Sequence, residues 1–231
     1  MNIAIILAGG SGLRLGGELP KQFMPVAGKQ VIEYSIEAFE SHARIDEVCI
    51  VTRADYVQAV EELVARRGYR KVKHVLPGGK ERYDSTLAAL KVYADDETNL
   101  LFHDAVRPLV SQRIISDCID ALQHYNAVGV AVKTTDTIIS VDDNECISGT
   151  LNRDHLRNVQ TPQCFKAGTI REAYHRALAD SAFTTTDDCG TVKRYMPSEP
   201  VYIVQGDTWN IKLTYKEDLA ILEQLIRLKT M

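Results

Sequence analysis

The sequence lacks the features that mark membrane, secreted and nucleic-acid-binding proteins. The formal net charge is −4, so there is no excess of Lys and Arg to attract nucleic acid or an acidic membrane surface. No basic region precedes the first apolar run, which is too short for a signal peptide, and no stretch approaches the length of a membrane span. We therefore expect a soluble, cytoplasmic protein that must hold any polyphosphate ligand with local cations.

Cysteine is scarce as well. The 5 cysteines are odd in number and scattered, with no C-x-x-C pair, which indicates reduced thiols rather than disulfides or a zinc site. The histidines outside segment 103–108 have no metal-ligand spacing, and no serine, cysteine or histidine has the setting of a catalytic nucleophile. The chain has 231 residues, 45% hydrophobic and 25% charged, which suits one α/β domain with a full core.

Strand-like and helix-like segments alternate through the first half of the chain. Apolar runs predict strands at Ala4–Leu7, Glu47–Thr52, Lys73–Leu76, Leu100–His103 and Val128–Val132. Amphipathic patterns predict helices at Val31–Ser41, Tyr56–Arg67, Arg82–Ala94 and Gln112–His124. This alternation predicts a Rossmann-like α/β fold, in which a mostly parallel sheet is flanked by helices and ligands bind outside the carboxyl ends of the strands.

The pattern changes after Thr134. Two short strand-like runs, Thr137–Val141 and Cys146–Leu151, are joined by the turn-forming residues Asp142-Asp143-Asn144. This hairpin has too few apolar positions to form a domain, so we interpret residues 134–155 as an arm that projects from a single domain, 1–231, onto a second subunit. The remaining segments predict helices at Ala167–Leu178, Asp187–Tyr195 and Lys216–Lys229 and a strand at Val201–Val204.

Residues 1–22 combine a strand, a glycine loop and two cations. The apolar run ends in Leu7-Ala8-Gly9-Gly10, whose backbone N–H groups let a phosphate approach, and Arg14 and Lys21 follow seven residues apart. A dinucleotide fingerprint needs a helix directly after its glycines, and a Walker loop needs Ser or Thr after its lysine, so neither fits. The string L-A-G-G-x-G-x-R with P-K-Q therefore predicts a nucleoside triphosphate site, with a plain tight turn as the alternative.

Two further segments follow predicted strands. Asp104 sits where the sheet opens toward the glycine loop, and one carboxylate beside a triphosphate is a good Mg²⁺ ligand. A helix N-cap is the alternative for Asp104, although it does not explain the nearby Arg107. In the segment Pro77–Ser85, glycines allow close approach of a base or ribose and Ser85 can donate to the ligand, but a plain strand–turn–helix junction has the same appearance.

Polar clusters without helix or strand periodicity occur later in the chain. They are Asn152-Arg153-Asp154, Gln160–Gln163, Thr184–Asp188 and Asn210–Thr214. In these clusters Arg153 and Lys212 are candidates to bind a second anionic group, while the cluster at Thr184–Asp188 is equally well explained as a helix cap.

Together these segments resemble the cytidylyltransferases that join CTP to a polyol phosphate, a group within the nucleotide-diphospho-sugar transferase fold. The resemblance runs from Ile3 to about Leu222. It rests on an ordered set of motifs: Leu7–Arg14, Pro20-Lys21-Gln22, Gly78–Ser85, His103–Pro108, Asp136-Thr137, Asn152-Arg153, Gln160–Gln163, Thr186-Asp187 and Asn210–Thr214.

Two members of this group resemble the sequence most strongly. One is the D-ribitol 5-phosphate cytidylyltransferase of teichoic-acid or capsule synthesis, which Leu7–Gly10, Gly79–Ser85, Cys189 and Leu213–Leu219 resemble. The other is the 2-C-methyl-D-erythritol 4-phosphate cytidylyltransferase of isoprenoid biosynthesis, in which Val159–Gln163 is also common. We expect D-ribitol 5-phosphate to be the acceptor, giving CDP-ribitol and pyrophosphate, with 2-C-methyl-D-erythritol 4-phosphate as the alternative.

The resemblance also implies a role for individual residues. Transition-state stabilisation would come from Arg14, Lys21 and Lys212, with Asp104 placing Mg²⁺. The CTP site would be lined by Leu7, Ala8, Gly9, Gly10, Gly79, Arg82, Ser85 and Ala105. The polyol phosphate would be held by Thr137, Arg153, Thr161 and Thr186, with Asp104 and Arg107 close to its hydroxyls. The resemblance further implies a homodimer in which the arm carries Arg153 to the partner's site.

Two other function classes remain as alternatives. A protein that senses or binds CTP without turnover predicts the loss of a catalytic cation, yet Arg14, Lys21 and Lys212 are all present. A sugar-1-phosphate nucleotidyltransferase that uses another base is disfavoured by Asn152-Arg153 and Gln160–Gln163.

Overall fold

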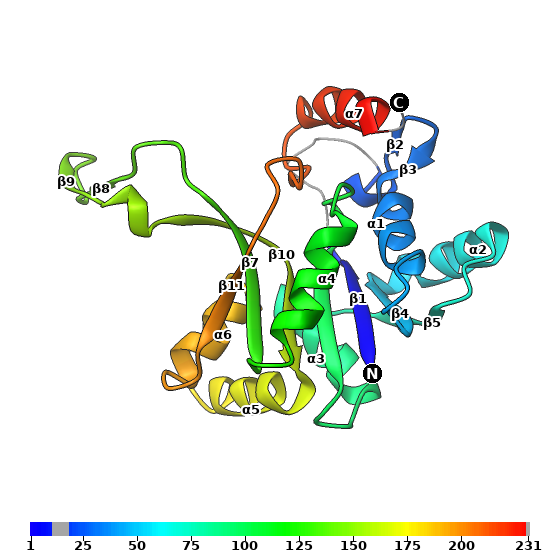
Figure 1. Ribbon diagram of the computed structural model, residues 1–231, viewed down its shortest axis with the longest axis horizontal. Coiled ribbons are helices and arrows are strands. Elements are labelled where there is room, and N and C mark those ends of the chain that lie inside the picture. The colour runs from blue at the N-terminus through cyan, green and yellow to red at the C-terminus, as the bar shows by residue number, and fades with distance from the viewer. Residues whose placement is uncertain (11–18, 230–231) are drawn as a thin grey trace.

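The computed structural model describes residues 1–10 and 19–229 and contains a seven-stranded sheet (Figure 1). The strand order is β11-β7-β10-β6-β1-β4-β5. These strands are β1 (Asn2–Ala8), β4 (Glu47–Thr52), β5 (Val72–Pro77), β6 (Asn99–Asp104), β7 (Ala127–Lys133), β10 (Arg157–Lys166) and β11 (Val201–Gln205). Only β10 is antiparallel to its neighbours, so the predicted mostly parallel α/β fold is confirmed.

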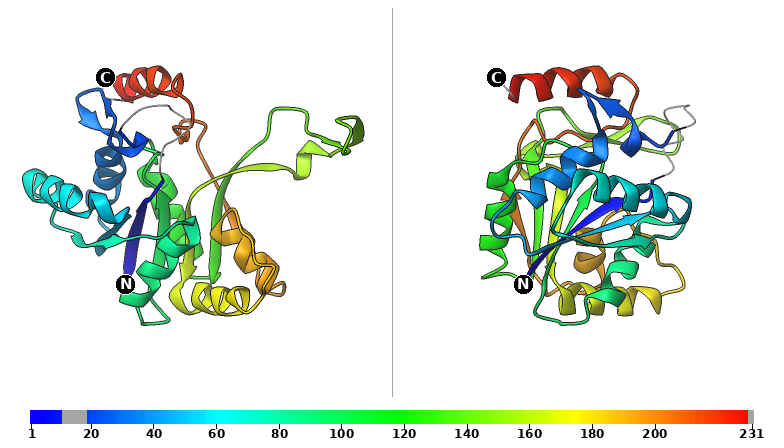
Figure 2. Two further views of the ribbon diagram at one scale, coloured as in Figure 1. Left: turned by 180° about the vertical axis from the view of Figure 1, so that it is seen from behind. Right: turned by 90° about the vertical axis from the view of Figure 1, so that its right-hand side faces the viewer.

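Helices cover both faces of this sheet (Figure 2). One face packs against α1 (Val31–Glu40), α2 (Val57–Arg67) and α4 (Gln112–Ala121). The other packs against α3 (Arg82–Val92), α5 (Ala167–Leu178) and α6 (Asp188–Tyr195). Within residues 1–10 and 19–229, no helix combines the length and the apolar character needed to cross a membrane.

Strand β1 shows how the sequence specifies these two layers. Ala4 and Ile6 pack in the layer of α1, whereas Ile3 and Ile5 pack in the layer of α3. Successive side chains of a strand point to opposite faces, so a strand covered on both sides is a continuous apolar run. The buried run stops at Ala8, and the glycines that follow leave the sheet at its carboxyl edge.

A third apolar cluster lies over this carboxyl edge. It joins the short hairpin of β2 (Pro25–Val26) and β3 (Lys29–Gln30) to helix α7 (Asp218–Lys229), which lies beside the hairpin in Figures 1 and 2. Leu213 is fully buried in it. The cluster therefore supports both Lys21, just before the hairpin, and Lys212, next to Leu213.

The predicted arm is present and extends away from the sheet (Figure 1). It consists of β8 (Ile139–Val141) and β9 (Ile147–Thr150), which pair in antiparallel fashion. Asp142 closes the turn, because its Oδ1 accepts hydrogen bonds from the backbone N–H groups of Asn144 and Cys146 at 2.9 and 3.0 Å. Apolar side chains on the arm are exposed, with Ile147 67% accessible, so this surface suits a partner molecule.

Strand β10 departs from the sequence prediction. The polar segment Gln160–Gln163 is expected outside any strand, and that expectation is wrong. Its polar side chains are buried and satisfied internally: Gln160 Nε2 donates to Asp207 O at 2.8 Å and Gln163 Oε1 accepts from Asp188 N at 2.9 Å. The register also shifts between Gln160 and Cys164, which removes the simple alternation of a strand. The other predicted strands and helices are confirmed, with small shifts at their ends.

Candidate active site

A cavity of about 1000 Å³ opens at the carboxyl edge of the sheet. Most of the residues predicted for catalysis and CTP binding line it: Leu7, Ala8, Gly9, Gly10, Lys21, Gly79, Arg82, Ser85, Asp104 and Lys212. They come from segments far apart in the chain, namely the end of β1, the segment just before the β2–β3 hairpin, the start of α3, the end of β6 and the segment before α7. Arg14, the other predicted catalytic cation, lies outside the described residues.

The glycine loop is held by Gln22, which is 1% exposed. Its Nε2 donates to the carbonyl oxygens of Ala8 at 2.6 Å and of Gly10 at 3.0 Å. These bonds tie the loop to the short helix η2 (Lys21–Phe23), so Lys21 is placed next to the loop. Sequence reasoning included Gln22 only as part of a motif and gave it no role.

The start of α3 forms the opposite wall. Ser85 lies in the first turns of α3, with its Oγ 3.3 Å from where a Cβ on Gly9 would stand and 2.6 Å from where a Cβ on Gly78 would stand. A Cβ at position 78 would therefore displace this hydroxyl. The helix itself is fixed by a capping box, in which the Glu81 backbone N–H donates to Asp84 Oδ2 at 2.9 Å. Gly79, Arg82 and Ser85 thus line the same cavity as the glycine loop.

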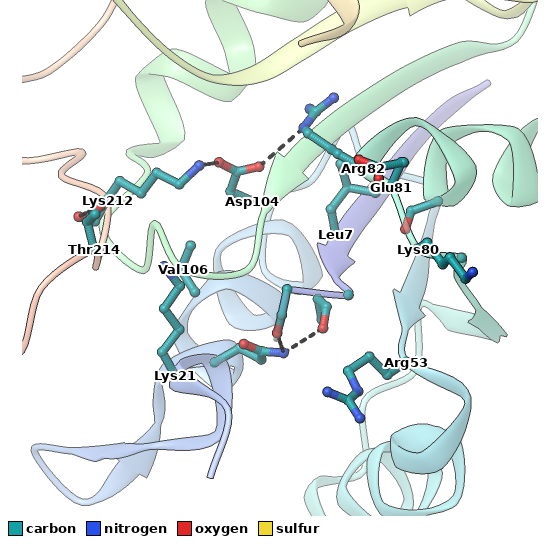
Figure 3. Close-up of a pocket in the computed structure, with 16 residues that line it drawn as sticks. Leu7, Lys21, Arg53, Lys80, Glu81, Arg82, Asp104, Val106, Lys212 and Thr214 are labelled. Carbon is teal, nitrogen blue, oxygen red and sulfur yellow. Dashed lines mark hydrogen bonds and ion pairs between the residues drawn. The ribbon is translucent and has the colours of Figure 1, made fainter. Parts of the chain in front are cut away.

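Asp104, at the end of β6, is surrounded by cations. Lys212 Nζ lies 2.8 Å from its Oδ2, and Arg82 Nε lies 3.9 Å from its Oδ1, so the two side chains approach it from opposite sides (Figure 3). Arg107 Nε is 3.8 Å away. Burial alone would raise the pKa of this carboxyl, but Lys212, Arg82 and Arg107 outweigh burial and hold the pKa well below its usual range. Asp104 is therefore an anion at neutral pH.

His103 and Thr161 form the support beneath Asp104. His103 Nε2 is 3.0 Å from the carbonyl of Arg107, which can only accept, so the proton is on Nε2 and Nδ1 accepts from Thr161 Oγ1 at 3.0 Å. Thr161 Oγ1 in turn accepts from the Asp104 backbone N–H at 3.1 Å. Burial lowers the pKa of His103 to about 4, which keeps the ring neutral.

Three of the predicted acceptor-binding residues lie away from the cavity of their own chain. Thr137 and Arg153 are exposed on the arm, and Thr186 is exposed just before α6; none of the three lines the cavity of its own chain. The hydroxyl of Thr161 is engaged beneath Asp104, so acceptor binding by these four residues stays a prediction.

Arg107 and Ala105, also predicted to contact substrates, are tied into the fold. The Arg107 guanidinium donates to Asn210 O at 2.8 Å and Val159 O at 3.3 Å. Ala105 is fully buried, and its backbone N–H donates to Leu7 O at 3.0 Å. Ala105 is not among the described residues that line the cavity.

Other residues line the cavity that sequence reasoning gave no role. Besides Gln22 they are Arg53, Lys80, Glu81, Val106 and Thr214. Arg53 directly follows the carboxyl end of β4, where ligands are expected to bind in a parallel sheet, so its position in the sequence could have indicated it. Its guanidinium pairs with Asp55 at 2.7 Å and lies over the ring of Tyr56.

The cavity is positively charged although the chain is not. Among the described residues that line it, five are cationic (Lys21, Arg53, Lys80, Arg82 and Lys212) and two are acidic (Glu81 and Asp104). This local excess suits a polyanion such as a nucleoside triphosphate. In the described part of the chain no group of three or more His, Cys, Asp or Glu side chains forms a metal cage. The donor set fits Mg²⁺ bound by one carboxylate together with substrate phosphates and water.

Comparisons with known proteins agree with this geometry. Residues 2–228 match the model of the IspD family, 2-C-methyl-D-erythritol 4-phosphate cytidylyltransferase. A 2-C-methyl-D-erythritol 4-phosphate cytidylyltransferase from Thermobifida fusca is 46% identical over 97% of this chain and 92% of its own length. The bifunctional ribulose 5-phosphate reductase/CDP-ribitol pyrophosphorylase of Haemophilus influenzae is 43% identical over 98% of this chain, which spans 48% of that protein.

The fold is shared with solved structures of the same group. The crystal structure of 4-diphosphocytidyl-2C-methyl-D-erythritol synthase from Anaerococcus prevotii superposes with a TM-score of 0.85 at 32% identity, covering 98% of this chain and 96% of the other. The family match extends over nearly the whole chain and includes the strands, loops and helices that build the cavity. The chain therefore belongs to the 2-C-methyl-D-erythritol 4-phosphate cytidylyltransferase family and is a nucleotidyltransferase.

Proposed function

We propose that this cytidylyltransferase transfers CMP from CTP to 2-C-methyl-D-erythritol 4-phosphate and releases pyrophosphate. The observation that carries the proposal is the match of residues 2–228 to the family of that name, joined by the 46% identity to the Thermobifida fusca enzyme. The sequence-based preference for D-ribitol 5-phosphate has weaker support. It remains the second candidate because the Haemophilus influenzae protein, a CDP-ribitol pyrophosphorylase, is 43% identical.

The proposed reaction is an in-line displacement at phosphorus. A phosphate oxygen of the acceptor attacks the α-phosphorus of CTP, and the bond from that phosphorus to the oxygen bridging to the β-phosphate breaks, so that pyrophosphate leaves. The nucleophile is already an anion, so no proton has to be removed. The protein must instead position two anionic substrates and stabilise charge.

The cavity supplies groups for both tasks. In the proposed mechanism Lys21 and Lys212, with Arg14 from outside the described residues, stabilise the charge that develops on the α-phosphate and the leaving group. The glycine loop and Ser85 hold the nucleotide between β1 and α3. Asp104 fixes Lys212, to which it is paired at 2.8 Å, and is the residue that would hold Mg²⁺. A bound Mg²⁺ would neutralise phosphate charge and align the oxygens for displacement.

The acceptor site is proposed to need a second copy of the chain. Arg153 and Thr137 are exposed on an arm that leads away from the sheet of its own chain (Figure 1). Packing of the arm on a twofold-related partner would bury its exposed apolar side chains and place Arg153 at the partner's acceptor phosphate.

Pyrophosphate release from CTP, measured with each acceptor side by side, tests the proposed function. We expect a higher kcat/KM with 2-C-methyl-D-erythritol 4-phosphate than with D-ribitol 5-phosphate. The reverse order would assign the chain to the second candidate. Tight CTP binding without release of pyrophosphate in the presence of either acceptor would instead indicate a nucleotide-binding protein without this activity.

A further inference from the structure

The carboxylate of Asp188 is fully buried and accepts hydrogen bonds from three side chains. Arg82 Nη1 donates to Oδ2 at 2.6 Å, while Thr86 Oγ1 and Tyr174 Oη donate to Oδ1 at 2.9 and 2.5 Å. The backbone N–H of Asp188 is also used, because it donates to Gln163 Oε1 at 2.9 Å. Asp188 thus joins α3, α5 and β10 to the start of α6, although it does not line the cavity itself.

One of these partners does line the cavity. The Arg82 guanidinium spans two carboxylates, since Nη1 pairs with Asp188 and Nε faces Asp104 at 3.9 Å. Its remaining nitrogen, Nη2, is buried and has no hydrogen-bond partner among residues 1–10 and 19–229. A buried N–H group without an acceptor is costly, and a charged one more so, unless a ligand supplies the acceptor. Two of the three guanidinium nitrogens therefore face protein carboxylates, and the third lacks an acceptor among the described residues.

We propose that Asp188 is a positioning residue, which fixes the Arg82 guanidinium so that Nη2 is presented to a substrate phosphate oxygen. Asp188 contributes no contact of its own to the cavity and acts through Arg82. The identity of the phosphate, from CTP or from the acceptor, rests on the proposed function. The orientation of Arg82 by Asp188 does not, because the contacts that carry it are present without a ligand.

The hydrogen bonds that Asp188 accepts make Asp188→Asn a suitable test substitution. All three side-chain partners of the carboxylate are donors, so Asp188→Asn, which keeps the shape, places an N–H group against at least one donor and removes the negative charge opposite Arg82. Thr86→Val is the matched control. It removes another hydrogen bond to the same carboxylate but leaves the ion pair with Arg82 intact.

The first experiment observes Arg82 directly in the ligand-free protein. In a ¹⁵N-arginine NMR spectrum the Arg82 Nε–H signal is assigned as the one that Arg82→Lys removes. We expect Asp188→Asn to shift or broaden this signal toward that of a solvent-exposed arginine, and Thr86→Val to leave it in place. An unchanged signal in a folded Asp188→Asn protein would overturn the inference, whether or not the chain turns over CTP.

The second experiment is a double-mutant cycle on pyrophosphate release. Asp188→Asn should lower kcat/KM by about tenfold or more, within the range known for coupled buried groups, whereas Thr86→Val should change it by about twofold or less. In an Arg82→Lys background, Asp188→Asn should cause little further loss. Losses that multiply would show that Asp188 acts independently of Arg82 and would refute the positioning role.

The substrate whose binding weakens identifies the phosphate. A rise in KM for CTP alone assigns Nη2 to the nucleotide, and a rise for the acceptor alone assigns it to the acceptor; an unchanged KM for both with unchanged kcat contradicts the inference. A wild-type protein that releases no pyrophosphate with either acceptor would remove the proposed function, while the NMR result would still decide the role of Asp188.

Discussion

Asp104 is the residue on which the charges of the cavity converge. It pairs with Lys212 and faces Arg82 and Arg107, so a single carboxylate orients three cations around the place where a triphosphate would lie. Lys21 is placed differently, on the short helix η2 that Gln22 ties to the glycine loop. The two hydrogen bonds of Gln22 therefore hold Lys21 beside the glycine loop.

Lys21→Ala is expected to lower kcat much more than it raises KM for CTP. A cation aimed at charge that develops on the α-phosphate acts mainly in the transition state, and its loss costs about 3–4 kcal/mol, or roughly two to three orders of magnitude in rate. Steady-state kinetics measure the effect. Lys29→Ala is a suitable control, because Lys29 lies on the neighbouring hairpin and pairs with Glu37. Near-normal turnover by Lys21→Ala would contradict the assignment.

His103 predicts a pH dependence of folding stability. Burial lowers its pKa from the ordinary 6.5 to about 4, so the unfolded chain binds a proton in this range that the folded chain does not. The stabilisation is complete above pH 6.5 and is lost as the pH falls toward 4; between pH 7 and 5 the loss is about 2 kcal/mol. Urea unfolding at both pH values should show it. His103→Asn should be less stable at pH 7 but lose less on acidification, and an equal loss in both proteins would exclude His103 as the cause.

At the scale of secondary-structure elements, the junction between β5 and α3 is the tightest part of the cavity wall. A Cβ at Gly78 would stand 2.6 Å from Ser85 Oγ, so Gly78→Ala must displace the serine or the loop. We expect a loss of about 1–3 kcal/mol of stability from overpacking, together with weaker CTP binding. Adding Ser85→Ala should restore part of the stability but not the binding. Thermal unfolding and CTP titration separate these effects, and a fully stable Gly78→Ala protein would argue against the close approach.

The elements also show what sequence reasoning can and cannot find. Asp104 and the glycine loop were predictable because each follows a continuous apolar strand, and parallel strands bring their carboxyl ends to one edge. β10 was missed because buried glutamines replace the usual apolar alternation. The contact between Asp188 and Arg82 joins residues that are 106 positions apart in the chain. The local sequence of Thr184–Asp188 does not indicate such a contact and is equally well explained as a helix cap.

For the whole molecule, the arm predicts activity that is shared between subunits. If Arg153 serves the partner's site, mixing Arg153→Ala with Lys21→Ala subunits should restore pyrophosphate release, because a mixed dimer contains one site with both cations. The unmixed variants are the controls. Sedimentation that shows a fully active monomer, or exchanged mixed dimers that stay inactive, would refute the shared site without affecting the cytidylyltransferase assignment.

The projecting arm also bears on how this protein can change during evolution. One wall of the cavity is built from β1, β6 and α3, whose neighbouring residues are locked into the core on both faces of the sheet, so most substitutions there carry a cost in folding. The arm is joined to that core only at its base (Figure 1). Its side chains are largely exposed. Under the proposed division of the site, acceptor preference can therefore drift through substitutions in residues 134–155 while the fold and the use of CTP are inherited unchanged.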